Sequence, residues 1–421
     1  MPESFDLIKT AMAAKTASYI LQSMPRDKKD KGLLAVADAL VANADAIIKE
    51  NAIDLENAQK AGTSKAMLDR LMLDKDRIDA MALSIRQVCD LDDPIGETLE
   101  EFVRPNGLRI SKVRVPMGVI GIIYESRPNV TSDAFSLCFK TGNAVILRGG
   151  SDAIASNKAI VSVIKEALAS VDITKDAVQL VTDTSREVAR QMMRCNSYID
   201  LLIPRGGSGL IRSVVENSTI PVIETGTGNC HIFVDESANI DMAVNIIFNA
   251  KTQGMGVCNA AESLLIHEKI AEDAIPAICK SLQAKDIEIR ADRKAFTLVP
   301  GSAADMKPAT EEDWGTEFLG PVISLAIVSN VDEAIAHVNR YNTHHSDAII
   351  TNDPENAEKF LNGVDSACVY VNASTRFTDG FEFGFGAEIG ISTQKLHARG
   401  PMGLRELTSY KYKVYGNGQI R

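Results

Sequence analysis

The sequence predicts an α/β fold with two doubly wound α/β domains and a separate β arm for oligomerisation. Between Met117 and Thr225, short apolar runs alternate with amphipathic stretches of helical period, the pattern of a parallel sheet with helices on both faces. The same alternation resumes at His231 and continues to about Val371. A helical region precedes the first domain, and extended segments flank the two domains.

Residues 1–97 are predicted to form helices that belong to the first domain. From Leu33 to Leu55, apolar residues recur at steps of three and four with charges between them, and Asn51 is the one polar residue of that series. Ala61-Gly62 supplies a helix stop. The turn residues at 92–96 then end the helical region.

The first sheet is expected within residues 116–230, which with part of 372–399 would form a Rossmann-like domain that binds a nucleotide. Sheets of this kind bind nucleotides beyond the carboxyl ends of their strands. Residues 231–371 would form the catalytic domain, with a helix at 242–251 followed by a glycine-rich loop that holds Cys258. Strands are expected at 118–124, 144–147, 177–181, 199–203 and 220–223, and then at 232–234, 263–266, 321–328, 348–351 and 368–371.

Residues 98–115 and 400–421 are predicted to form a β-hairpin and oligomerisation arm. Asn106-Gly107 between two alternating segments is a strong hairpin signal. Thr408–Tyr415 alternates in the same way. Because an unpaired final strand would expose its edge, we expect it to pair with the hairpin of another subunit.

Composition excludes several classes of function. The net charge of −11 argues against a nucleic-acid partner. No apolar run approaches the roughly 20 residues needed to cross a bilayer, and the N-terminus lacks the order of a signal peptide, so no membrane association and a cytoplasmic location are expected. The seven cysteines are scattered without a Cys-x-x-Cys pair, which excludes a disulfide framework or zinc site. His344-His345 resemble a metal pair, but a turn with solvated imidazoles fits them better, and no metal is expected.

Cys258 lies in the sequence Gln-Gly-Met-Gly-Val-Cys-Asn, residues 253–259. Glycines let the backbone approach a ligand closely and present its N–H groups. A thiol at such a turn can attack a carbonyl carbon while nearby amides stabilise the oxyanion. The alternative is a cysteine that packs as a small hydrophobic residue. Residue types alone leave both open.

Four segments, in this order and spacing, resemble the aldehyde dehydrogenase superfamily over most of the chain from about Val115 to Val414. They are Val-Pro-Met-Gly-Val-Ile-Gly at 115–121, Thr-Gly-Asn-Ala-Val-Ile-Leu at 141–147, the loop from Gly254 to Cys258, and Glu-Phe-Leu-Gly-Pro-Val at 317–322. The resemblance implies the aldehyde dehydrogenase-like fold and a catalytic thiol at Cys258.

Further segments resemble one branch of that superfamily, which reduces an acyl phosphate. They are Tyr-Glu-Ser-Arg-Pro-Asn-Val-Thr at 124–131, Leu-Arg-Gly-Gly-Ser at 147–151, Ile-Pro-Arg-Gly-Gly-Ser at 203–208 and Gly-Asn-Cys-His-Ile-Phe-Val-Asp at 228–235. The resemblance implies attack of Cys258 on L-glutamate 5-phosphate, loss of phosphate and reduction of the thioester by NADPH. Glutamate 5-semialdehyde, a precursor of proline, would then cyclise to 1-pyrroline-5-carboxylate. A dimer or tetramer, and glutamate 5-kinase as a partner, are also expected.

The resemblance implies a cofactor site. Glu317 would hold the nicotinamide ribose hydroxyls, the alternative being a solvated surface carboxylate. The residues Arg205, Gly206, Gly207 and Ser208 follow a strand and open a helix, so their amides would bind pyrophosphate, although glycines also serve ordinary turns. Arg148, followed by Gly149, would pair with the 2′-phosphate or else be solvated.

Substrate contacts are expected at Arg127, Asn129 and Arg376. Arg127 and Asn129 lie beyond the first strand of the sheet, at the end where ligands bind. The Asn129 amide would stabilise the oxyanion beside the Cys258 N–H, or would cap a helix that begins near Thr131. Arg376 would bind a carboxylate or phosphate.

Glu224 lies 34 residues before Cys258 (258 − 224), where ordinary aldehyde dehydrogenases carry their general base. Here it would be a vestigial or water-excluded carboxylate, a partner that tunes the thiol, or a cap of the turn at Thr225–Gly228. Two other functions remain to be distinguished: a general NAD(P)-dependent aldehyde dehydrogenase that hydrolyses its thioester, and a non-catalytic scaffold subunit.

Overall fold

The computed structural model describes residues 5–302 and 306–421. The chain divides into two compact units. Unit 1 comprises the described part of Met1–Glu224 together with Gly384–Gly390 and Met402–Arg421, and unit 2 comprises Thr225–Phe383 and Ile391–Pro401. The chain passes between units at 224/225, six residues before the boundary expected at 230/231. The expected arm segments, apart from residues 400 and 401, fall in unit 1.

The N-terminal region of unit 1 is helical, and the series from Leu33 to Leu55 falls on two consecutive helices. The chain breaks at Asn43, whose φ of −106° and ψ of 16° end one helix and start the next. Asn51 is buried and holds three partners: its amide donates to the Leu71 carbonyl at 2.8 Å and to Ser156 Oγ at 3.0 Å, and it accepts from the Leu73 N–H. The five helices are α1 Leu7–Leu21, α2 Arg26–Ala42, α3 Ala44–Lys60, α4 Lys65–Leu71 and α5 Lys75–Asp90.

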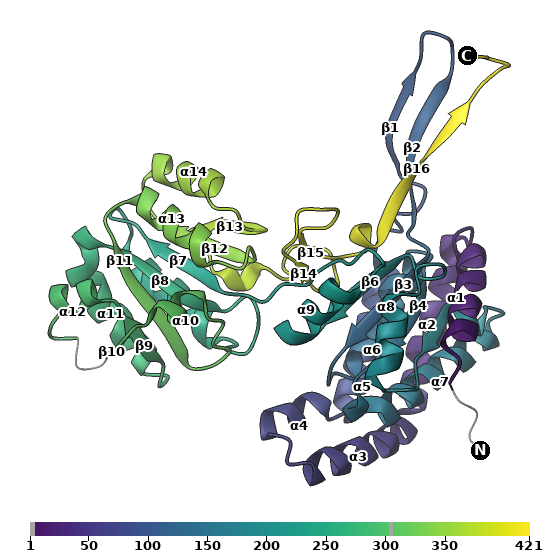
Figure 1. Ribbon diagram of the computed structural model, residues 1–421, viewed down its shortest axis with the longest axis horizontal. Coiled ribbons are helices and arrows are strands. Elements are labelled where there is room, and N and C mark those ends of the chain that lie inside the picture. The colour runs from purple at the N-terminus through teal and green to yellow at the C-terminus, as the bar shows by residue number, and fades with distance from the viewer. Residues whose placement is uncertain (1–4, 303–305) are drawn as a thin grey trace. The chain divides into compact units, whose positions relative to one another are not determined.

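A four-stranded parallel sheet with the order β5-β4-β3-β6 forms the centre of unit 1 (Figure 1). The prediction of a further strand at 220–223 was wrong, since only an isolated bridge joins Leu202 to Val222. Leu202 donates to the Pro221 carbonyl and accepts from the Ile223 N–H, and the pairing stops there because neither Pro221 nor Pro204 has an N–H with which to extend it. The strands are β3 Val119–Tyr124, β4 Ala144–Arg148, β5 Val178–Leu180 and β6 Leu201–Arg205, and the helices are α6 Asn129–Lys140, α7 Ile154–Ser170, α8 Arg186–Met193 and α9 Ser208–Asn217.

A three-stranded antiparallel sheet with the order β1-β2-β16 forms the arm of unit 1. It consists of β1 Thr98–Val103, β2 Arg109–Pro116 and β16 Thr408–Tyr415. Pairing with the hairpin of another subunit stays a prediction for one edge of Thr408–Tyr415, and the strand predicted there is confirmed. It pairs with β2 of its own chain over eight residues, from Thr408 opposite Pro116 to Tyr415 opposite Arg109 (Figure 1). The edges left open are therefore those of β1 and β16.

Unit 2 is built on a seven-stranded parallel sheet with the order β10-β9-β11-β8-β7-β12-β13. The strands β9 and β10 escaped the sequence patterns because they are short and carry charged residues. The strands are β7 Cys230–Val234, β8 Ala261–His267, β9 Glu288–Ala291, β10 Met306–Pro308, β11 Val322–Val328, β12 Ser346–Ile350 and β13 Cys368–Val371. The helices are α10 Ile240–Thr252, α11 Ala271–Gln283, α12 Arg293–Leu298, α13 Val331–Tyr341 and α14 Pro354–Gly363.

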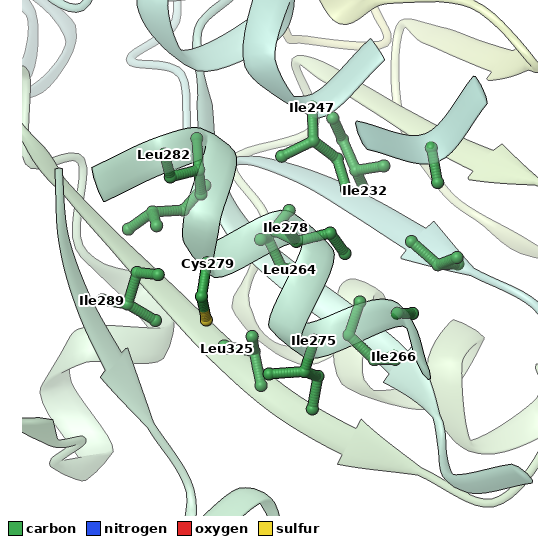
Figure 2. Packing of buried hydrophobic residues seen from close by; sticks show 14 of the residues in the cluster. Ile232, Ile247, Leu264, Ile266, Ile275, Ile278, Cys279, Leu282, Ile289 and Leu325 are labelled. Carbon is green, nitrogen blue, oxygen red and sulfur yellow. The ribbon is translucent and has the colours of Figure 1, made fainter. Parts of the chain in front are cut away.

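Apolar side chains cover both faces of this sheet. On one face, Ile232, Leu264 and Leu325 pack against Ile247 of α10 and Ile278 of α11, all with little or no exposed surface (Figure 2). On the other face, residues such as Phe233 and Leu265 pack with Val338 of α13 and Phe360 of α14. A strand buried on both faces reads as a continuous apolar run, which is why β7, β8 and β11 were predictable.

Smaller elements complete the described chain. The strands β14 Ile391–Ser392 and β15 Gly400–Pro401 pair antiparallel. Short 3-10 segments are η1 Ser151–Ala153, η2 Lys175–Ala177, η3 Glu268–Ile270, η5 Glu311–Gly315, η6 Thr375–Phe377 and η7 Arg405–Leu407. In residues 5–302 and 306–421, no helix combines the length and apolarity that crossing a membrane requires.

Candidate active site

Cys258 lies in the loop between α10 and β8, at residues 253–260, which we call the nucleophile loop. Of the seven cysteines, all within the described residues, Cys258 alone is not buried. The backbone beneath it is closely supported: a Cβ on Gly228 would lie 1.4 Å from the Cys258 carbonyl oxygen, so only glycine fits there. The Cys230 thiol donates to the same carbonyl at 3.3 Å. The loop therefore presents an accessible thiol on a fixed backbone.

Glu317 is connected to this loop through the same glycine. The Gly228 N–H donates to Glu317 Oε1 at 2.6 Å. Burial raises the pKa of Glu317, and the hydrogen bond from Gly228 opposes that shift. Glu317 is partly buried, so it is not the freely solvated carboxylate considered as the alternative. One carboxylate oxygen is engaged by the protein, and Gly228 joins Glu317 to Cys258 within unit 2.

Arg376 also lies against the nucleophile loop. Its Nε donates to Gln253 Oε1 at 3.0 Å, and its Nη1 contacts Asn259 Oδ1. The Asn259 amide in turn donates to the Thr378 carbonyl at 2.9 Å. The Arg376 guanidinium thus contacts loop residues on both sides of Cys258 and places a positive charge against the loop that carries the thiol.

Behind the loop, a buried polar chain corrects the expectation for the histidine pair. His345 is fully buried, not solvated, and burial lowers its pKa to about 4, so its imidazole is neutral at pH 7. Its Nδ1 lies 2.8 Å from Ser346 Oγ, which contacts Thr378 Oγ1 at 2.7 Å. His344 alone is exposed. Among the described residues, no group of three or more His, Cys, Asp or Glu side chains is placed to hold a metal ion.

The predicted cofactor residues of unit 1 gather at the carboxyl ends of its parallel strands. Arg148 ends β4, Arg205 ends β6, and Glu125 follows β3. The Gly207 N–H at the start of α9 donates to Glu125 Oε2 at 3.0 Å. A helix N-terminus favours an anion because its first N–H groups lack partners in the helix. Here that anion is the Glu125 carboxylate of the chain itself.

Arg148 is partly buried and donates from Nη2 to the Thr184 carbonyl at 2.7 Å, so the alternative of a solvated side chain was wrong. Burial lowers its pKa, and the nearby carboxylates of Asp183 and Glu125 raise it. Gly149 has a packing reason for lacking a side chain, because a Cβ there would lie 2.2 Å from Asn157 Nδ2.

Asn129 and Arg127 lie at the start of α6 in unit 1. The helix begins at Asn129, not near Thr131, and no side chain caps it, so the alternative of a capping Asn129 was wrong. The Asn129 amide donates instead to Asp133 Oδ2 at 3.0 Å. Burial raises the pKa of Asp133 to about 6, against the hydrogen bond from Asn129 and the charge of Arg205. Within unit 1, these residues form one group with the strand ends, while Cys258, Glu317 and Arg376 form another within unit 2.

The sequence profile of the aldehyde dehydrogenase family matches residues 3–300 and 297–412 of this chain.

The chain belongs to the aldehyde dehydrogenase family.

Within the family, the chain is similar over its full length to several gamma-glutamyl phosphate reductases. The enzyme of that name from Clostridium botulinum (strain Alaska E43 / Type E3) is 59% identical over 416 residues, which is 99% of this chain and 100% of the relative. One from Clostridium perfringens (strain 13 / Type A) is 58% identical and covers 99% of each chain. The crystal structure of the one from Thermotoga maritima is 50% identical, has a TM-score of 0.96, and covers 99% of this chain and 100% of its own.

These relatives confirm the family and branch predicted from the sequence, and they confirm the aldehyde dehydrogenase-like α/β fold. The chain is accordingly an oxidoreductase of a family that works with a nicotinamide cofactor. An acetylating aldehyde dehydrogenase from Geobacillus thermoglucosidasius, only 17% identical, shares the fold at a TM-score of 0.68 over 98% of this chain and 97% of its own. The residues that sequence reasoning missed are Glu125, Gly228 and Cys230, whose partners lie far away in the chain.

Proposed function

We propose that this protein reduces L-glutamate 5-phosphate to L-glutamate 5-semialdehyde and phosphate, with NADPH as the reductant, through a thioester on Cys258. In the reverse sense this is a phosphorylating, NADP-dependent glutamate-5-semialdehyde dehydrogenase. The observation that carries the proposal is the accessible Cys258 thiol, fixed by Gly228, which also binds Glu317. The full-length relatives named for this activity support the choice of substrate.

In the first step, the Cys258 thiolate attacks the acyl carbon of the acyl phosphate. A sulfur–carbon bond forms, the carbon–oxygen bond to phosphate breaks, and phosphate leaves with the electron pair. Because phosphate is a good leaving group, the step needs positioning and oxyanion stabilisation more than a strong general acid. The Cys258 N–H and the Asn129 amide are the proposed oxyanion donors, and Asn129 would have to share or leave its bond to Asp133.

A nicotinamide cofactor held by Glu317 and the residues at the start of α9 would supply a hydride to the thioester carbon. The carbon–sulfur bond then breaks, and the thiolate is regenerated as the aldehyde forms. The free amine of glutamate 5-semialdehyde is placed to close a five-membered ring, so the product cyclises to 1-pyrroline-5-carboxylate, a precursor of proline. Exclusion of water from Cys258 would prevent hydrolysis of the thioester, which would waste the activated substrate.

The cofactor is assigned to residues that fit its groups. Glu317 keeps one carboxylate oxygen available beyond its bond to Gly228 and would accept from the ribose hydroxyls. The N-terminus of α9, with Arg205, Gly206, Gly207 and Ser208, would bind the pyrophosphate in exchange for Glu125. Arg148, with Gly149 beside it, would pair with the 2′-phosphate and so favour NADPH over NADH.

The substrate would be bound by Arg127 and Arg376, whose guanidinium groups match carboxylate and phosphate. The protein is proposed to work in the cytoplasm as a homo-oligomer, a dimer or tetramer, assembled through the open edges of β1 and β16. Since acyl phosphates hydrolyse in water, direct transfer from glutamate 5-kinase would conserve the substrate, and that kinase is the proposed partner.

The test follows NADPH oxidation with glutamyl phosphate that is generated enzymatically in the assay. Wild type is expected to oxidise NADPH in proportion to the acyl phosphate supplied, and Cys258→Ala is expected to oxidise none. A parallel assay with NADH measures the cofactor preference. Equal rates for wild type and Cys258→Ala would overturn the thioester mechanism, and no rate with wild type would overturn the substrate.

A further inference from the structure

A completely buried pair of charged side chains flanks the nucleophile loop. Lys251 lies in the last turn of α10, and Glu262 is the second residue of β8. Both side chains have 0% exposed surface, and Lys251 Nζ contacts Glu262 Oε2. The pair therefore joins the two ends of the loop that carries Cys258. Burial lowers the pKa of Lys251 and raises that of Glu262, and each group supports the charge of the other.

Such a pair is not explained by stability. Taking two charges out of water costs more than their attraction commonly returns, and apolar residues of similar volume often replace buried pairs without loss of stability. An apolar pair would also suit this position, because the neighbouring core is made of isoleucine, leucine and alanine. The contact made by the second carboxylate oxygen of Glu262 indicates a more specific role for the pair.

Glu262 Oε1 accepts a hydrogen bond from the Leu319 N–H at 3.1 Å. Leu319 has a φ of +51°, in the left-handed region that a non-glycine residue adopts only when its surroundings hold it. Glu317 lies two residues earlier and binds the Gly228 N–H. Glu262 belongs to β8, the strand that follows the nucleophile loop. Its carboxylate therefore attaches the turn at Leu319, and with it the nearby Glu317, to this strand.

We propose that Glu262 is a positioning residue for Glu317, and that Lys251 is present to balance its buried charge. The contact with Leu319 sets where the Glu317 carboxylate stands relative to Cys258, and thereby how tightly the cofactor ribose is bound. The inference rests on the proposed function, because binding of the cofactor by Glu317 is part of that proposal. If Glu262 positions Glu317, cofactor affinity depends on the oxygen that accepts from the Leu319 N–H, while the stability of the protein does not require that oxygen.

Two matched double variants separate the effect of this oxygen on cofactor affinity from the effect of the charged pair on stability. K251M/E262Q and K251M/E262M both remove the charges and have side chains of similar length, but only the glutamine keeps an oxygen for the Leu319 N–H. Cofactor binding is measured without turnover through the fluorescence of Trp314, the single tryptophan. Trp314 lies three residues before Glu317, and its carbonyl accepts from the Asn229 amide at 2.7 Å.

The double variant with methionine at both positions, K251M/E262M, is expected to bind NADPH about 3–10-fold more weakly than K251M/E262Q, the ratio for one net hydrogen bond. Its melting temperature is expected to equal or exceed that of the glutamine partner, since it buries no unpaired amide. The rate of Cys258 alkylation is expected to differ by less than about twofold between them, because both keep the Gly228 and Cys230 contacts that fix the thiol. A pair with a purely structural role would not weaken cofactor binding while leaving the melting temperature unchanged.

Glu317→Gln and Glu262→Asp complete the experiment. If Glu317→Gln weakens NADPH binding while the two double variants bind it equally, the positioning role of Glu262 is overturned. If Glu317→Gln leaves binding unchanged, the cofactor role of Glu317 is overturned instead, which is a separate failure. Should either double variant not fold, Glu262→Asp keeps the charge opposite Lys251 but withdraws the oxygen from Leu319. Unchanged NADPH affinity in that variant would also overturn the proposal.

Discussion

At the scale of single residues, exposure and backbone contacts distinguish Cys258 from the buried cysteines of the chain. Cys138 and Cys230 are buried, and burial raises the pKa of each thiol, so each is held in the unreactive protonated form. Cys258 is partly exposed, and Gly228 and Cys230 contact its backbone carbonyl and hold it in place. The same residue type is therefore buried and protonated at two positions, while at a third it is partly exposed and is the proposed nucleophile.

Cys258→Ser is expected to lower reduction of glutamyl phosphate to less than about a hundredth of the wild-type rate, because a hydroxyl is far less acidic and less nucleophilic than a thiol. Serine is nearly isosteric, so the affinity for NADPH should stay within about twofold of wild type. Steady-state NADPH oxidation and the fluorescence titration of Trp314 measure the two quantities. A serine variant with more than about a hundredth of the activity would contradict covalent catalysis through this thiol.

Glu125→Gln is expected to strengthen NADPH binding by about 2–5-fold, which is the effect of one charge at an exposed helix terminus. The Glu125 carboxylate accepts from the Gly207 N–H and so competes with an anionic pyrophosphate for the start of α9. A neutral amide competes less. The titration is repeated at high salt, where screening should shrink the difference. Weaker binding in the variant would show that α9 does not receive the pyrophosphate.

Much of the candidate site could be predicted, but only where a residue carries its own local signal. Cys258 and Glu317 were found because each lies in a short segment that resembles a family pattern. Gly228 and Glu262 were not found, since their roles arise from contacts across 89 and 57 positions of the chain. Burial was also out of reach, as His345 shows, because adjacent polar residues give no sign of which one faces the core.

At the scale of elements, long buried strands were predictable and connections were not. The strands β7, β8, β11 and β12 lie within two residues of the ranges expected, because apolar runs between turn residues mark both ends. The break at Asn43 was missed, since the residues on either side keep a helical period and only the backbone at Asn43 departs from it. The strand β16 was placed correctly, but its pairing with β2 of the same chain was not predicted, because alternation identifies a strand and not its neighbour.

Asp54→Ala is expected to lower the free energy of unfolding by about 2–4 kcal/mol, since it removes a cap and leaves buried N–H groups without an acceptor. Asp54 of α3 is buried and accepts from the N–H groups of Ala155 and Ser156 at 3.1 and 2.8 Å, in the first turn of α7. Urea unfolding is the measurement.

The matched control is Asp45→Ala. Asp45 is an exposed aspartate in the first turn of the same helix, so its replacement should lower the free energy of unfolding by no more than about 1 kcal/mol. Equal losses in the two variants would show that Asp54 does not hold α7.

At the scale of the whole molecule, the chain carries two parallel sheets with different polar groups at their ends and loops. In unit 1, helix and strand ends present N–H groups and arginines, as at Gly207 and Arg148, which suits a phosphate-rich ligand. In unit 2, a loop between α10 and β8 presents a thiol, with Glu317 tied to it through Gly228. The proposed division of labour, with the nucleotide bound by unit 1 and the thiol carried by unit 2, would permit reduction, but it would equally permit a hydrolytic dehydrogenase.

The two reactions differ in what releases the acyl group from Cys258. A hydrolytic dehydrogenase needs a base that activates water, and Glu224 lies at the sequence position where ordinary family members carry one. In a phosphorylating enzyme, phosphate itself is the nucleophile and needs no such base. Oxidation of glutamate 5-semialdehyde is therefore expected to require phosphate, and Glu224→Gln is expected to lose far less activity than Cys258→Ser. The measurement is NADPH formation from the semialdehyde, first without phosphate and then after its addition, in all three proteins. Rapid oxidation without phosphate that Glu224→Gln abolishes would identify a hydrolytic enzyme and exclude reduction of the acyl phosphate as the reaction for which this site is built.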